Sequence, residues 1–190
     1  MFFPIASAIR RQAKSAHELA MVNLILVNLL MLIALLAGSF LQHGSPLADY
    51  KLAGVLVPFF ISLAIMAFTF AKAAKLAGAG PWFVAVHWRL ATLRYKILLI
   101  AYAVGAGLIG GGWLLSTTQK TAGMQELMFV ALQRVAIAPV LIALMVLIML
   151  ESGALYQAGR GEVPDSLIKR FPPPADLRGG DAEFTLEDPS

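Results

Sequence analysis

The chain contains no cysteine among its 190 residues. This absence excludes disulfides, thiolate metal sites, cysteine-held iron–sulfur clusters and thiol nucleophiles. Charge is also scarce, because Asp, Glu, Lys and Arg make up only 14% of the residues, against about 25% in soluble domains. Hydrophobic residues make up 59%, which is more than a soluble domain of this size can hide. The lipid bilayer is therefore expected to be the solvent for much of the chain.

Signatures of common catalytic sites are absent too. The HExxH, G-x-S-x-G and P-loop patterns do not occur. The GLIGGG run lies inside an apolar stretch and follows no strand, so it is a poor phosphate cradle. The net charge of +4 comes from Lys and Arg beside apolar runs, where lipid headgroups attract them. We therefore predict no catalytic residue, no metal site and no nucleic-acid partner.

Four apolar runs predict an all-α membrane protein with four transmembrane helices. The first run has 23 uncharged residues, about 34 Å of helix, enough to cross a hydrocarbon core of about 30 Å. Short polar loops after the first and third runs predict two antiparallel hairpins. The predicted spans are 19–41, 52–71, 97–115 and either 127–150 or 135–156. They form a transmembrane domain, 19–156, between an N-terminal flank, 1–18, and a tail, 157–190.

A basic segment, residues 72–96, separates the two predicted hairpins and contains five Lys or Arg and no acid. Apolar residues recur in it at close to the helical period, which predicts a cytoplasmic amphipathic helix that continues into the third span. Together with the N-terminal flank, this segment supplies the residues expected at lipid headgroups. They are Arg10, Arg11, Lys14, Lys72, Lys75, Trp82, Trp88, Arg89, Arg94 and Lys96.

Lys and Arg are distributed unequally about the predicted spans. Twelve of the fifteen lie before the first span, between the second and third spans, or after the fourth. The two other loops hold only Lys51 and Lys120. Because loops rich in Lys and Arg stay in the cytoplasm, both termini are predicted to be cytoplasmic, in an inner (plasma) membrane.

Two kinds of residue predict helix packing inside the membrane. Amides in the first span each need a hydrogen-bond partner, and small residues four apart in the third span allow close approach of another helix. That helix is either another span of the same chain or part of a different subunit. The predicted packing residues are Asn23, Asn28, Ala103, Gly107, Gly111, Ala106 and Gly110.

The fourth span carries a charge at one end or the other. Only 16 uncharged residues separate Arg134 from Glu151, about 24 Å of helix, which is too short to cross comfortably. The span therefore includes either Arg134 or Glu151. The two charges are about 25 Å apart along a helix and cannot pair within one copy. The embedded charge needs snorkelling, a partner helix or a lipid phosphate.

Beyond residue 156 the chain becomes proline-rich and then acidic. Such a composition cannot build a core of its own, so residues 157–190 are predicted to be a cytoplasmic tail. The tail is either solvated or laid across the cytoplasmic surface of a partner. In the second case Phe171, Phe184 and Leu186 are the sparse apolar anchors.

Three histidines, His17, His43 and His87, are the candidates for cofactor ligands. His17 and His43 flank the first span about 39 Å apart, so they cannot share one haem or metal ion. His17 and His87 both belong at the cytoplasmic surface and can meet there. They form the candidate site for a haem or a quinone.

These observations favour a non-catalytic integral subunit, scaffold or assembly element of a larger inner-membrane complex. Its partners are lipid and other membrane subunits, and no cofactor is predicted for this function. One alternative is a small oligomeric channel or transporter whose path is lined by residues 105–112, Arg134 and Glu151. Another is a haem- or quinone-binding redox subunit that uses His17, Glu18 and His87.

Overall fold

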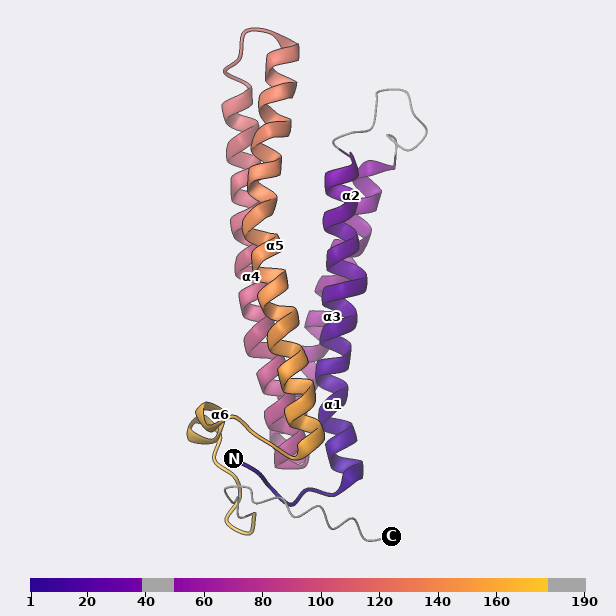
Figure 1. Cartoon of the computed structure of the whole chain (residues 1–190), viewed down its shortest axis with the longest axis vertical. Coiled ribbons are helices and arrows are strands. Elements are labelled where there is room, and N and C mark those ends of the chain that lie inside the picture. Colours follow the sequence, from indigo (N-terminus) through magenta and orange to yellow (C-terminus); the bar gives the residue numbers. More distant parts are fainter. Residues whose placement is uncertain (39–49, 178–190) are drawn as a thin grey trace.

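The computed structural model describes residues 1–38 and 50–177, and its elements there are all helices (Figure 1). Four of the helices are long and apolar enough to cross a membrane, which confirms that part of the prediction. One isolated bridge pairs Phe2 with Glu162. The elements are α1 (Ser7–Val22), the π-helical η1 (Asn23–Leu29), α2 (Leu30–Gly38), α3 (Lys51–Ala79), α4 (Trp82–Ser116), α5 (Ala122–Arg160) and α6 (Asp165–Arg170).

The four long apolar helices extend beyond the uncharged runs that predicted them. Backbone hydrogen bonds are satisfied within a helix in water as well as in lipid, so a helix need not end where hydrophobicity ends. α4 starts directly after Pro81 and runs for 35 residues, so the basic segment after Pro81 continues into the third apolar run, whereas residues 72–79 belong to α3. α5 starts at a Thr121 cap, which accepts from the Met124 amide, and contains both Arg134 and Glu151.

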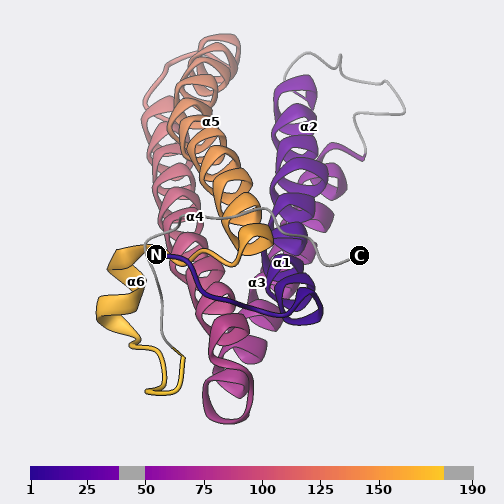
Figure 2. The same ribbon diagram turned by 60° about the horizontal axis from the view of Figure 1, so that its bottom comes forward.

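The first and last described segments of the chain lie side by side at one end of the bundle (Figures 1 and 2). The Phe3 amide donates to the Gly161 carbonyl at 2.9 Å, and the Val163 amide donates to the Met1 carbonyl at 3.0 Å. Gly161 ends α5 in the left-handed conformation, with φ 79°. A Cβ there would lie 2.7 Å from the Phe3 carbonyl oxygen, so the close approach of the two segments requires glycine.

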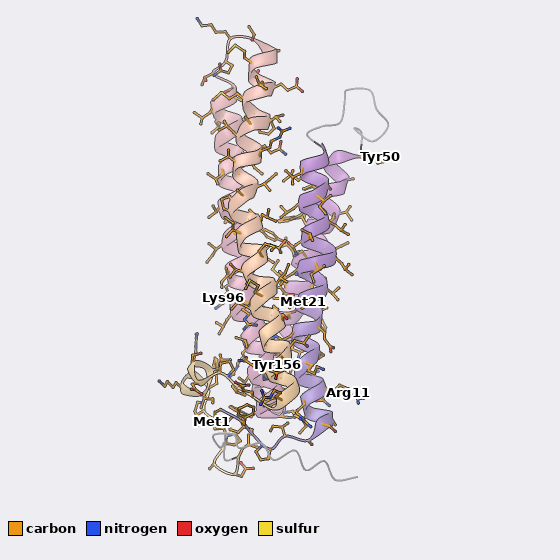
Figure 3. The ribbon with its side chains drawn as sticks, in the orientation of Figure 1. Met1, Arg11, Met21, Tyr50, Lys96 and Tyr156 are labelled. Atoms are coloured by element: carbon orange, nitrogen blue, oxygen red, sulfur yellow. The ribbon has the colours of Figure 1, made fainter. Side chains whose placement is uncertain are left out.

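We call this end the basic end. It holds four cations that contact other parts of the protein. Arg10 contacts the C-terminal end of α5, and Lys72 contacts Trp88. Arg89 contacts Phe171, and Arg160 contacts Phe2. In Figure 3, Met1, Arg11 and Tyr156 lie at this end and Tyr50 lies at the opposite end. The basic end therefore brings together charges from all four long helices.

Close packing of small residues occurs between α1 and α5. α1 packs against α5, and both helices carry buried alanines four residues apart. These are Ala16 and Ala20 on α1 and Ala154 and Ala158 on α5. Small side chains at this spacing let two backbones approach closely. The approach brings polar groups of α1 and α5 within hydrogen-bond distance.

Toward the opposite end, the α4–α5 pair diverges from α2 and α3 (Figure 1). α4 and α5 stay packed against each other through glycines. A Cβ at Gly105 would lie 2.7 Å from Val140 Cγ2, and one at Gly112 would lie 3.0 Å from Leu132 Cβ. The bundle is thus a four-helix structure at the basic end and two separate helix pairs at the other.

Candidate functional site

A chain of hydrogen bonds runs through the protein interior at the basic end. It joins His17 of α1, His87 of α4 and Glu151 of α5, which are 0%, 0% and 2% exposed. His17 Nδ1 lies 2.6 Å from Glu151 Oε2, and His17 Nε2 lies 2.9 Å from His87 Nδ1. His87 Nε2 lies 3.2 Å from the backbone oxygen of Glu162. We call these four groups the His–Glu chain.

Arg94 adds a permanent positive charge beside the His–Glu chain. Its Nη1 is 3.4 Å from Glu151 Oε1, and its side chain is 13% exposed. Glu151 therefore has one oxygen facing His17 and the other facing Arg94. A buried carboxylate is tolerated only when such partners compensate for its lost hydration. The pairing explains how α5 carries an acid inside the bundle.

Helical spacing accounts for how the sequence builds this site. His87 and Arg94 are seven residues apart, two turns, so they share one face of α4. His17 follows the buried Ala16 on α1, and Glu151 precedes the buried Ala154 on α5 by three residues. The small side chains bring α1 and α5 together, and the polar side chains beside them then meet.

A second group of polar side chains joins η1, α3 and α4 deeper in the bundle. Asn28 Nδ2 donates to the Asn23 carbonyl at 2.8 Å and to Ser62 Oγ at 3.1 Å. Ser62 Oγ and Tyr102 Oη are 2.9 Å apart, and the Tyr102 hydroxyl also donates to Asn28 Oδ1. Asn28 thus bonds to two other helices from within a π-helical turn, a geometry that often marks functional positions.

Polar atoms also occur between these two groups. Tyr95 follows Arg94 directly and lies seven residues before Tyr102, on the same face of α4. The Tyr95 hydroxyl is buried and lies close to the Asn23 and Thr69 side chains. Polar side chains therefore recur within the apolar core from the basic end as far as Asn28.

The predicted cofactor pair, His17 and His87, does come together. A haem iron between two imidazoles would hold their nitrogens about 4 Å apart, given metal–nitrogen distances of about 2 Å. Here the facing nitrogens are 2.9 Å apart and hydrogen-bonded, so the pair does not fit a haem in this arrangement. Glu18 is exposed, and His43 lies outside the described residues. No group of three His, Asp or Glu in the described part of the chain could hold a metal ion.

The predicted headgroup residues divide into two sets. Arg11, Lys75 and Lys96 are exposed, whereas Trp88 is 1% exposed and lies under the Lys72 ammonium at 4.2 Å. This burial corrects the expectation for Trp88, because its ring contacts protein and not lipid headgroups. The aliphatic and aromatic residues of the amphipathic segment are likewise in the core. Phe83 and Val86, for example, are 1% and 0% exposed.

The predicted small-residue face of α4 meets open space in the part of the chain that the structure describes. Ala103 and Ala106 are exposed. A Cβ built on Gly107, Gly110 or Gly111 would meet no atom within 4 Å. Packing of this face against another span of the same chain was one of the two predicted alternatives, and the structure contradicts it. The face of α4 that packs on α5 carries Gly105 and Gly112 instead.

The residues predicted to line a channel lie at different places on α4 and α5. Gly105 and Gly112 face α5. Arg134 is exposed on α5, whereas Glu151, about 25 Å further along the helix, is buried at the basic end. Glu151 is therefore the charge that the protein interior holds.

The first part of the predicted tail covers the chain's own surface. Val163 and Leu167 are 0% and 4% exposed. The Phe171 carbonyl accepts from Trp82 Nε1 at 3.1 Å, and the Arg89 guanidinium lies 4.2 Å from the centre of the Phe171 ring. Residues 161–177 thus dock on α4 and on the N-terminal segment. The predicted anchors Phe184 and Leu186 lie outside the described residues.

Ser62, Tyr95 and Tyr102 are interior polar residues that the sequence analysis did not single out. The spacing of the two tyrosines, seven apart on a helix with the first directly after Arg94, was the available signal. Ser62 gave none, because serine often bonds to its own helix.

Comparisons with known proteins add no further evidence. No family model, curated protein or solved structure matches the chain. Its function is therefore argued from its own residues.

Proposed function

We propose that the chain is a non-catalytic integral subunit, scaffold or assembly element of a larger complex in a bacterial-type inner membrane. Its helices pair as two antiparallel hairpins, and its basic end and both termini face the cytoplasm. The unequal distribution of Lys and Arg supports this orientation. The proposal assigns no catalytic residue and no cofactor.

The observation that carries the proposal is the exposed small-residue face of α4. This face consists of Ala103, Ala106, Gly107, Gly110 and Gly111, and its three glycines have open space beside them. Glycine in a helix costs about 1 kcal/mol relative to alanine. Contact with lipid gives nothing in return, whereas contact with a second helix gains close backbone packing. We infer that a helix of another subunit covers this face.

Substitution of Gly107 tests this contact. Gly107→Leu fills the open face, so the chain should insert normally but lose its partners when membranes are extracted in mild detergent. Gly153→Leu is the matched control, because Gly153 is also a mid-helix glycine with no atom within 4 Å, but lies on α5. Mass spectrometry of the purified complexes measures the stoichiometry of the partners.

Two results would contradict the proposal. One is that the Gly107→Leu chain retains every partner at the stoichiometry of the unaltered protein. The other is that the unaltered chain purifies with no foreign subunit and as a homo-oligomer, which would favour the channel alternative.

The orientation is tested by single cysteines, since the chain has none of its own. Gly78 at the basic end and Gly123 at the opposite end both have open space for a side chain. We expect a membrane-impermeant maleimide to label Gly123→Cys from outside intact spheroplasts. It should label Gly78→Cys only after the membrane is permeabilised. The reverse pattern would show that the basic end faces outward.

A further inference from the structure

The His–Glu chain has three contacts, and each needs one proton between its two heavy atoms. The contacts are Glu151 to His17, His17 to His87, and His87 to the Glu162 carbonyl. A carbonyl oxygen only accepts, so His87 Nε2 must carry a hydrogen and donate. The direction of the last bond is thus known without observing a hydrogen atom.

Two neutral imidazoles supply two of the three protons, because each carries one N–H. The third proton must come from a protonated Glu151, an imidazolium at His17 or an imidazolium at His87. In each case all three contacts are hydrogen bonds. The three cases differ only in which group carries the extra proton.

We propose that Glu151, His17 and His87 form a binding site for one exchangeable proton, whose occupancy sets how firmly residues 161–163 dock on the bundle. Without the extra proton, one of the three contacts brings two lone pairs together. When both imidazoles are protonated, two N–H groups face each other between His17 and His87. The three contacts therefore need one proton more than two neutral imidazoles supply, and that one proton completes the chain.

The contact that opens on deprotonation is the one to Glu162. His17, His87 and Glu151 lie on long helices that are packed against each other. Glu162 lies beyond the end of α5, on the segment that pairs with residues 1–3. That segment can shift more easily than a packed helix. It therefore moves away from His87 when His87 Nε2 loses its hydrogen.

Charged and titratable groups on the neighbouring elements constrain this site. Arg94 and Tyr95 come from α4, next to Glu151 and on the same side of the helix as His87. On α3, Lys72 lies over Trp88, and on α1, Arg10 donates to the Gly159 carbonyl. Both cations are thus engaged with other groups. Glu18, beside His17 in sequence, is exposed.

The sign of the pH dependence follows from proton linkage. The docked state binds one more proton than the loosened state, so docking is favoured at low pH and is lost as the pH rises. A carboxamide at position 151 removes this dependence. Its N–H donates to His17 Nδ1, His17 Nε2 donates to His87 Nδ1, and His87 Nε2 donates to Glu162, so all three bonds form without an extra proton.

Electron–electron resonance distances in the full chain test the proposal. Spin labels on Gly78→Cys of α3 and Ser166→Cys of α6 sit at open or exposed positions on either side of the docked segment. In lipid nanodiscs, the distance distribution should be narrow at about pH 5.5 and about twofold broader at about pH 9. Glu151→Gln should stay narrow at both pH values, and Glu18→Gln should behave as the unaltered chain.

His87→Phe removes the bond to Glu162 and should give the broad distribution at both pH values. The proposal is overturned if the unaltered chain has the same width at both pH values, or if Glu151→Gln still broadens at alkaline pH. Should Glu151→Gln fail to fold, the pH dependence of the unaltered chain and of His87→Phe decides the question. A narrow distance distribution in the His87→Phe chain would also overturn the proposal.

Discussion

The two ends of the bundle are built on different principles. At the basic end, α1, α3, α4 and α5 converge, alanines permit close contact, and charged groups are buried with partners. At the opposite end, α4 and α5 pack closely against each other and diverge from α2 and α3, and the glycines of the small-residue face meet open space among the described residues (Figure 1). One end therefore satisfies its polar and small residues within the chain, and the other leaves its small residues for a neighbour.

The two ends show that similar patterns of small residues have different uses in a membrane. Alanines four apart on α1 and α5 lie in the core, whereas small residues four apart on α4 are exposed. Packing between helices in lipid depends on shape and hydrogen bonding, because lipid is as apolar as leucine. A small-residue pattern predicts that a helix is approached closely, but not by which helix.

The largest contrast in stability is expected between matched leucines of α5. Leu144 is 0% exposed in the middle of the bundle, and Leu127 is 72% exposed near the opposite end. Leu144→Ala should lower the free energy of unfolding by about 2–3 kcal/mol, because it leaves a cavity. Leu127→Ala should lower it by less than about 0.5 kcal/mol. Denaturant titration in detergent micelles measures both, and equal losses would mean that the opposite end is packed as tightly as the middle.

A smaller contrast is expected between two glycines on different faces of α4. Gly105→Leu should destabilise the isolated chain by about 1–3 kcal/mol, because the new side chain meets Val140. Gly107→Leu should leave the stability of the isolated chain unchanged or slightly raised, because it meets no atom and removes a helix-weakening glycine. The same titration applies. A large loss for Gly107→Leu alone would place an internal contact on the exposed face.

The smallest effect is expected from the interior polar side chains. Asn28→Ala removes the hydrogen bonds to Ser62 and Tyr102 and should lower the free energy of unfolding by about 1 kcal/mol. Thr92→Val is the control, because the Thr92 hydroxyl donates to the Arg89 carbonyl of its own helix. Loss of this hydroxyl should lower the free energy of unfolding by less than half as much as Asn28→Ala does. If the two variants are equally stable, the Asn28 contacts between helices contribute nothing measurable.

The four spans and their order were predictable because hydrophobicity is a local property of each run. The helix ends were harder to predict, since α5 begins at Ala122, before both predicted starts of the fourth span. An uncharged run measures how much of a helix prefers lipid, whereas caps such as Thr121 and Gly161 determine where the helix ends.

The candidate site was predictable only in part. The positions of His17 and His87 at the same membrane surface indicated that they could meet. Their bonds to each other and to Glu151 depend on which faces of α1, α4 and α5 are turned inward. That rotation is set by the packing of all the helices at once, so it cannot be derived from any one of them.

By itself, the sequence determined that this protein has four apolar helices and where its charges lie along them, because lipid solubility and helix length depend on composition and residue spacing. Tertiary structure alone decided that Glu151 is buried between His17 and Arg94 and that the α4 glycines stay uncovered. Burial is a relation between helices: the same acid or glycine faces lipid, water or protein according to how its helix is rotated and what packs beside it.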